Sequence, residues 1–312
     1  MRVTQNLFSD ALVSRLSSLT SRQYTLQNQV SSGLRVQAAS DDPTAMQNVL
    51  NYQANMAAND QYASNISTLQ TRATSVYGVL QQLQNVSTNV SVISTSAGDA
   101  SLTDLDNYAA KVSTAIEEAL VQVNLKDSAT GQYYFGGTAS NQPPFVATRD
   151  AQGKVTAVTY QGNTLNNQVE ITSDSTLSLD VPGANTTGSG TQGLVTDSRS
   201  GADFFNHLIS LRDHLLAKDK ASITSTDVPG LKIDENHILS QVSNNGTLQS
   251  RLESAAIFAG NNTTALTQMI SKASDAEMVS TVVQLNQAQT SYQAALQSGA
   301  KIMQISLLNY IQ

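Results

Sequence analysis

Two histidines in one segment are the first residues that could do chemistry. His207 and His214 lie seven positions apart, which is two turns of a helix, and His237 belongs to another segment. Histidines that share a metal ion on one helix usually lie three or four positions apart. The spacing therefore predicts ordinary surface or interface histidines and no metal site.

Other groups of reactive residues also have a structural explanation. Asp41 and Asp42 form a carboxylate pair, but an aspartate directly before Pro43 is a typical N-cap. Gly136 and Gly137 follow an aromatic segment without a phosphate-binding pattern, which favours a turn. No serine, histidine and acid can be assigned to a nucleophilic triad. We expect no catalytic residue, no cofactor and no bound metal, and an enzyme is the least favoured class.

The composition favours assembly over ligand chemistry. The chain has 312 residues, a net charge of −7, only 13% charged residues, and neither Cys nor Trp. A negative net charge argues against nucleic acid and anionic membranes as partners, and the missing cysteines exclude disulfides and thiolate metal sites. No segment approaches the roughly 20 apolar residues of a membrane span, and Met1 to Ser9 is polar. We therefore expect any export to proceed without a cleaved signal peptide.

Helices are predicted over most of the chain. The first ends at Ser31-Ser32-Gly33, and the second begins at Pro43 and continues to about Ser94. Ser101 and Asp104 suit an N-cap and its third helical position, before a helix over 105–123. Later helices are predicted over 203–218 and from Pro229-Gly230 onward, the last one continuing into the C-terminal helix.

A β-rich segment interrupts the helices. Short β-branched or aromatic stretches separated by Gly, Pro and Asn predict strands at 133–135, 155–160, 169–172 and 176–181. The stretch 185–200 is rich in Gly, Ser and Thr and predicts a loop. The predicted fold class is therefore mainly α, an elongated helical bundle with N- and C-terminal coiled-coil helices and a small β-rich inserted domain. The expected domains are 1–42 and 271–312 as two halves of a terminal coiled coil, 43–130 and 201–270 as a helical rod, and 131–200 as the insert.

Both terminal helices carry an apolar stripe with a spacing of four and three residues. Such a narrow stripe is typical of a coiled-coil seam, which needs a partner helix. We expect these residues to form an assembly seam, through contacts with each other or with other copies of the chain. The predicted seam residues are Leu12, Leu16, Leu19, Leu26, Val30, Met278, Val282, Leu285, Tyr292, Leu296 and Met303.

Four motifs resemble those of a known family. Ser31-Ser32-Gly33, followed by Asp41-Asp42-Pro43, is similar to the N-terminal signature of bacterial flagellins and their hook-associated relatives. The opening residues 1–4, the stretch 133–138 followed by Pro144-Phe145, and the C-terminal stretches 286–295 and 306–310 favour the hook–filament junction members of that family.

The resemblance implies a structural adaptor of the bacterial flagellum, located outside the cell between hook and filament. Family members are exported through the flagellar type III apparatus, and their terminal helices order only on assembly. The implied partners are other copies of the chain, hook-associated protein 1, flagellin and a flagellar export chaperone. Two alternatives remain: a flagellin that forms the filament itself, and a secreted coiled-coil adhesin with a β-rich tip.

Overall fold

The computed structural model describes residues 2–128, 130–178 and 181–311, with side chains described between Asp10 and Lys301. Its contacts divide the chain into two compact units. The first unit contains residues 1–59 and 261–312, and the second contains residues 60–260. Both limits fall inside long helices, whereas the domain limits expected from the sequence fall near helix ends; those domain limits stay a prediction.

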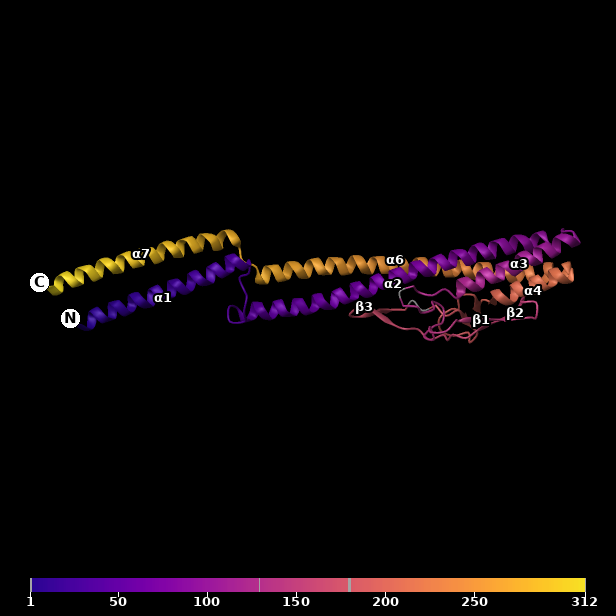
Figure 1. Ribbon diagram of the computed structural model, residues 1–312, viewed down its shortest axis with the longest axis horizontal. Helices are drawn as coiled ribbons and strands as arrows, with labels where there is room; N and C mark the ends of the chain where they lie inside the picture. The colour runs from indigo at the N-terminus through magenta and orange to yellow at the C-terminus, as the bar shows by residue number, and fades with distance from the viewer. Residues whose placement is uncertain (1, 129, 179–180, 312) are drawn as a thin grey trace. The chain divides into compact units, whose positions relative to one another are not determined.

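The first unit consists of helices. Helix α1 (Arg2–Ser32) and helix α7 (Met278–Ile311) lie side by side with the chain termini at the same end of the pair (Figure 1). The unit also includes the first part of α2 (Pro43–Ser96) and the last part of α6 (Val228–Ser274). These two parts are joined by Asn59, which is buried and donates to Thr263 Oγ1 at 2.7 Å. A buried polar contact of this kind fixes the register of two paired helices.

The second unit is a helical bundle with the β-rich segment against it. The rest of α2 and α6 belongs to this unit together with α3 (Leu102–Val123), α4 (Phe204–Ala217) and the short α5 (Lys220–Ser222). The predicted start of α3 is confirmed, because the Ser101 and Asp104 side chains each accept from the other's backbone N–H. One core cluster joins α2, α3, α4 and α6 and includes fully buried Leu83, Ile116 and Leu208.

The β-rich segment forms three small sheets. Strands β1 (Phe145–Arg149) and β2 (Val155–Tyr160) pair antiparallel, as do β3 (Val169–Thr172) and β4 (Ser175–Leu177). Strand β6 (Thr196–Asp197) lies between β5 (Ala184–Asn185), which is parallel to it, and β7 (Ala202–Asp203), which is antiparallel. Phe145 packs against Phe205 of α4 with ring centroids 5.6 Å apart, which fixes the segment on the bundle. The predicted fold class, mainly α with a small β insert, is confirmed.

Three local predictions were wrong. Residues 133–135 form turns, with one isolated bridge from Tyr133 to Lys126, because Tyr134 and Phe135 are buried and no strand lies beside them. Pro229 and Gly230 lie within a helix, since the π-helix η1 (Ile223–Asp227) precedes them. Its wider turn, in which the Val228 N–H donates to Ile223 O, suits a following proline that lacks an N–H. Helices α6 and α7 are interrupted at residues 275–277, where the chain pairs with Leu34.

Candidate assembly interface

The α1–α7 pair is the candidate functional site, and its two helices are antiparallel. Leu12 of α1 lies against Gly299 of α7, and Gln23 of α1 donates from Nε2 to the carbonyl oxygen of Ala288 at 3.1 Å. The predicted seam residues of α1, namely Leu12, Leu16, Leu19, Leu26 and Val30, are all buried or half-buried. The structure therefore brings the predicted stripe of α1 against α7 within a single chain. That the pairing forms only on assembly stays a prediction.

Small side chains on α7 allow the two helices to approach closely. A Cβ placed on Gly299 would lie 2.5 Å from Leu12 Cδ2, which is far inside van der Waals contact. Ala288 is also buried, and its backbone carbonyl is close enough to accept the Gln23 amide. The least exposed positions of α7 follow a spacing of four and three residues; they are Thr281, Leu285, Ala288, Tyr292, Ala295 and Gly299.

The stripe predicted on α7 faces α1 only in part. Leu285 and Tyr292 are half-buried as expected, but Met278, Val282 and Leu296 are 43%, 39% and 45% exposed. The predicted stripe therefore follows the edge between the buried side of α7 and its exposed side. Small residues allow α7 to approach α1 closely, whereas the sequence prediction was based on the large apolar residues of the helix. Met303 lies outside the residues whose side chains the structure describes, and the assembly role of the whole set stays a prediction.

A second, exposed apolar stripe follows from this arrangement. Val279 and Val283 of α7 are 78% and 60% exposed and lie next to Met278 and Val282 on the helix surface. We call Met278, Val279, Val282, Val283 and Leu296 the outer stripe. No residue from 278 to 300 carries a charge. An exposed apolar stripe on an uncharged helix is suited to a contact with a further helix.

The segment between α1 and α2 joins the pair to the end of α6. The backbone N–H groups of Arg35 and Val36 donate to Ser274 O at 2.6 and 3.2 Å, and the N–H of Ala276 donates to Gly33 O at 2.8 Å. These bonds satisfy a carbonyl at the C-terminal end of α6, which has no partner within the helix. The turn from α6 into α7 is therefore tied directly to the turn from α1 into α2.

Arg35 completes this connection through its side chain. Its guanidinium donates to Ala273 O at 2.8 Å and to Asp42 Oδ2 at 3.2 Å. The ion pair is solvent-exposed, and exposed pairs add little stability by themselves. The Arg35 side chain nevertheless connects three segments of the chain, because it contacts both Asp42 and Ala273. The seam prediction missed Arg35, although the residue lies only two positions after Gly33 of the family motif.

The Ser31-Ser32-Gly33 motif closes the C-terminal end of α1. Gly33 has φ +74°, and its N–H donates to Gln29 O at 2.9 Å, which is the geometry of a glycine that ends a helix. Ser32 Oγ donates to Asn28 O and accepts the N–H of Leu34. Ser31 is exposed on the last turn. The motif is therefore structural: it turns the chain out of α1 toward the end of α6.

The Asp41-Asp42-Pro43 motif begins α2, as predicted. Asp42 Oδ1 accepts the N–H of Ala45 at 3.0 Å, and Pro43 is the first residue of the helix. Asp41 Oδ2 accepts the N–H groups of Gln37 and Ala38 at 3.0 and 2.9 Å. These backbone donors hold the pKa of both carboxyls below the ordinary value, with Arg35 also lowering that of Asp42. Both groups therefore act as charged hydrogen-bond acceptors and not as an acid–base pair.

Gly136 and Gly137 lie in a tightly packed part of the second unit, where a larger side chain would not fit. A Cβ on Gly137, which has φ +62°, would lie 2.3 Å from the backbone oxygen of Asn163. The Tyr160 hydroxyl donates at 2.9 Å to Phe135 O and accepts the N–H of Gly183. Burial raises the pKa of Tyr160 to about 12, so it stays a neutral donor. The predicted turn at residues 136–137 is confirmed.

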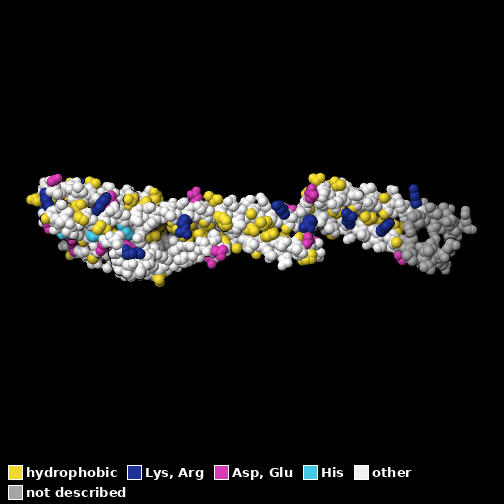
Figure 2. Space-filling model, turned by 180° about the vertical axis from the view of Figure 1, so that it is seen from behind, with side chains coloured by type: hydrophobic (Ala, Val, Ile, Leu, Met, Phe, Trp, Pro, Cys, Tyr) yellow, Lys and Arg dark blue, Asp and Glu magenta, His cyan; other side chains and the backbone are white. Residues whose placement is uncertain are grey.

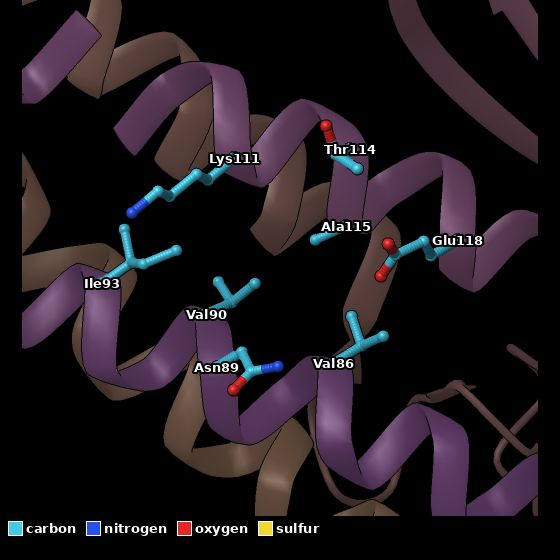
Figure 3. Close-up of a pocket in the computed structure, with 8 residues that line it drawn as sticks. All are labelled: Val86, Asn89, Val90, Ile93, Lys111, Thr114, Ala115 and Glu118. Atoms are coloured by element: carbon cyan, nitrogen blue, oxygen red, sulfur yellow. The ribbon is translucent and has the colours of Figure 1, made fainter. Parts of the chain in front are cut away.

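One groove among the described residues carries both an acid and a base. The groove, of about 410 Å³, lies between α2 and α3, with Lys111 near one end and Glu118 near the other (Figure 3). Its other lining residues are uncharged, and the two charged groups do not lie side by side. Within the described residues, no three His, Cys, Asp or Glu residues lie close enough to hold a metal ion, and no helix is long and apolar enough to cross a membrane.

Comparison with known proteins supports the family resemblance. Residues 3–139 match the family described as the bacterial flagellin N-terminal helical region. No curated protein matches the chain.

Several solved structures share the fold. A putative flagellar hook-associated protein from Vibrio parahaemolyticus has a TM-score of 0.62 at 18% identity, covering 75% of this chain and 100% of that chain. Flagellar hook-associated protein 3 from Legionella pneumophila has a TM-score of 0.60 at 14% identity, covering 72% and 98%. FlgL from Bacillus cereus has a TM-score of 0.55 at 16% identity, covering 70% and 97%. Residues 3–139 are thus similar to the N-terminal helical region of bacterial flagellins, and the chain shares the fold of flagellar hook-associated protein 3.

Proposed function

We propose that the protein is a structural component of the bacterial flagellum, a junction protein that joins the hook-associated protein 1 zone to the flagellin filament. The flagellin N-terminal region at residues 3–139 and the fold shared with flagellar hook-associated protein 3 support this proposal. The same relationship suggests hook-associated protein 1, flagellin and an export chaperone as partners. It also suggests a location outside the cell, reached by flagellar type III export without a cleaved signal, and a role without catalysis.

One observation carries the assembly part of the proposal. After α7 has paired with α1, it still exposes the outer stripe on a stretch without any charged residue. Figure 2 shows that charged side chains are sparse on the visible face of the protein, where apolar patches lie among uncharged polar groups. Uncharged polar and apolar side chains can be buried between subunits without the desolvation cost of charges. The terminal pair is therefore suited to packing between copies of the chain.

The proposal can be tested with a charge placed on α7. Val279→Glu introduces a carboxylate into the outer stripe, close to the N-terminal end of α7, where the helix dipole tolerates it. We expect a folded, secreted protein that no longer attaches filaments to hooks in cells lacking the wild-type chain. Ser291→Glu is the matched control, because Ser291 is exposed on a third side of α7, away from both α1 and the outer stripe. If Val279→Glu supports filament attachment as well as the control does, the outer stripe is not an assembly surface.

A flagellin is the second candidate function, since the matched family is the flagellin N-terminal region. A flagellin elongates filament seeds by itself, whereas a junction protein adds only a limited zone. Purified chain added to filament seeds and examined by electron microscopy distinguishes these outcomes. Filaments that grow steadily from the purified chain alone would assign it as a filament subunit.

A further inference from the structure

Two histidines on α4 each bind a buried carboxylate of the neighbouring helical segment. His207 Nδ1 lies 2.7 Å from Asp234 Oδ2 of α6, and His214 Nδ1 lies 2.7 Å from Asp227 Oδ2 at the end of η1. Both aspartate side chains are at most 1% exposed, whereas the His207 and His214 side chains are 28% and 32% exposed. Each pair therefore has a buried acid on one side and an imidazole that can exchange protons with water on the other.

The spacing of the two pairs shows that they form one arrangement. The histidines lie seven residues apart on α4, and the aspartates lie seven apart on the opposing segment in the reverse order. Gly230 lies between the two acids, and a Cβ there would be 3.1 Å from His207 Cδ2, so the glycine makes room for the imidazole. From the sequence these histidines are predicted to be surface or interface residues, because the acids that they meet are distant along the chain.

Each buried carboxylate has one further donor. Asp234 Oδ1 accepts the N–H of Asp203 at 2.9 Å, and Asp227 Oδ1 accepts the Ser210 hydroxyl at 2.8 Å. The histidines supply the remaining donor in both cases. Because a buried carboxylate without enough donors is costly, the state of the imidazole decides how well these acids are satisfied.

The charged groups around the histidines are mainly carboxylates. His207 faces Asp234, with Asp203 and Asp227 adding weaker attraction, and His214 faces Asp227 at the C-terminal end of α4. Asp219, at the start of α5, also interacts with His214. The nearby lysines are engaged elsewhere: Lys218 binds Asp106 and Leu102 O, and Lys220 donates to Ala100 O.

The third histidine has a different environment. His237 is buried, with Nε2 2.7 Å from Gly193 O and Nδ1 3.2 Å from Ser200 Oγ. Its ring contacts a carbonyl and a hydroxyl of the β-rich segment and no carboxylate. His237 is therefore an internal reference for an imidazole without an acid partner.

We propose that the His207–Asp234 pair is the pH-sensitive part of a clamp, completed by the His214–Asp227 contact, that holds α4 on η1 and α6 and loosens as the medium becomes alkaline. When His207 is protonated, the buried carboxylate of Asp234 is neutralised by a charged hydrogen bond. When His207 is neutral, that carboxylate keeps its full buried charge. The clamp lies wholly within the second unit and does not depend on the proposed assembly role.

The direction of the pH dependence follows from the first pair. The hydrogen bond from His207 to Asp234 raises the pKa of His207, and burial raises the pKa of Asp234 despite that bond. A group whose pKa is raised on folding holds its proton more tightly in the folded state, so its contribution to stability declines as pH rises through the raised pKa. The stability contributed by the protonation of His207 is therefore complete below the ordinary histidine pKa and is lost as pH rises through the raised pKa of His207.

The experiment uses the full-length chain with ¹³C-labelled histidine. Because the chain has only three histidines, NMR can follow each imidazole separately during a titration from pH 5 to 9.5. We expect His207 to titrate above the ordinary value, and Asp234→Asn to return it toward that value. His207→Asn and His214→Asn keep a donor near Nδ1 but cannot take up a proton, and they serve as assignment variants. Asp203→Asn is the matched control for the carboxylate change, because Asp203 contributes only weakly to His207.

A second measurement covers variants that fail to fold. Hydrogen exchange of the α4 amides, corrected for the intrinsic pH dependence, should become faster from pH 6.5 to 9 in the wild-type chain. The double variant His207→Asn/His214→Asn should show a much smaller change. A His207 that titrates at or below the ordinary value, or equal changes in exchange for wild type and double variant, would overturn the clamp.

Discussion

Gly299→Leu tests the close approach of α1 and α7 at its narrowest described point. An alanine at this position could be accommodated by rotation of Leu12, because the nearest atom, Cδ2, is at the end of a flexible side chain. A leucine is too large for that adjustment and must separate the helices locally. Ala300→Leu is the matched control, since Ala300 is the next residue on α7 and is exposed.

The expected magnitude follows from the overpacking of the closed contact. Overpacking typically costs about 1–3 kcal/mol. The helix propensity gained by replacing a glycine stabilises α7 whether or not α1 is paired with it, so this gain does not offset the cost. The free energy needed to open α1 from α7 should therefore fall by about 1–3 kcal/mol in Gly299→Leu, which is a factor of roughly 5–150 in the open population. Ala300→Leu should leave that population unchanged.

Trypsin provides the assay, because α1 carries exposed Arg15 and Arg22 within the paired region. If opening and closing are fast compared with cleavage, the cleavage rate follows the open population. We expect cleavage at these two sites to accelerate roughly 5–150-fold in Gly299→Leu and to be unchanged in Ala300→Leu. Equal rates in the two variants would refute the packing argument. A wild-type chain cleaved as fast as an unfolded peptide would show that the pair does not form before assembly.

Three further predictions concern other contacts. The chain has no cysteine, so Leu12→Cys/Gly299→Cys should form one intramolecular disulfide on oxidation, seen as a faster band on a non-reducing gel; only intermolecular dimers would contradict the pairing. Gly137→Ala should lower the melting temperature of the second unit more than Gly153→Ala, because both positions have positive φ but only the first is crowded by a backbone oxygen. The hydrogen bonds that Asp197 accepts, first of all from the Arg199 side chain, lower the pKa of Asp197 to about 2. The stability that this carboxylate gives the folded chain is therefore present above the ordinary aspartate pKa and is lost as pH falls toward 2. Asp197→Asn should flatten the acid side of a plot of melting temperature against pH, and an unchanged plot would contradict this role.

Local sequence signals predicted the elements that depend on neighbouring residues. Asp42 before Pro43 and Ser101 before Asp104 predicted helix starts that the structure confirms, because capping bonds join residues three positions apart. The stripe on α1 was also predicted correctly at Leu12 and Leu26, since its spacing follows the period of the helix.

The errors arose where distant segments decide the conformation. Residues 133–135 have a strand-like composition but lie in turns. The backbone carbonyl of Phe135 accepts hydrogen bonds from the Tyr160 hydroxyl and the Gly183 N–H, and not from a neighbouring strand. No helix was predicted directly before Pro229, whereas the π-helical turn η1 leads straight into α6 and accommodates the proline. Neither conformation can be predicted from the residues next to Phe135 or Pro229 alone.

The sequence alone determined that both ends of this chain are helices with apolar stripes, that residues 278–300 carry no charge, and that the motifs beside these helices resemble those of the flagellins. These properties depend on residue type and on the period of the helix. Only the tertiary structure decided which side of α7 meets α1, because small residues such as Ala288 and Gly299 give a closer fit than the larger apolar residues beside them. It also decided that His207 and His214 meet buried acids, since that contact requires two helices to pack in one register. Complementary shape and charge between distant segments cannot be read from spacing within either one.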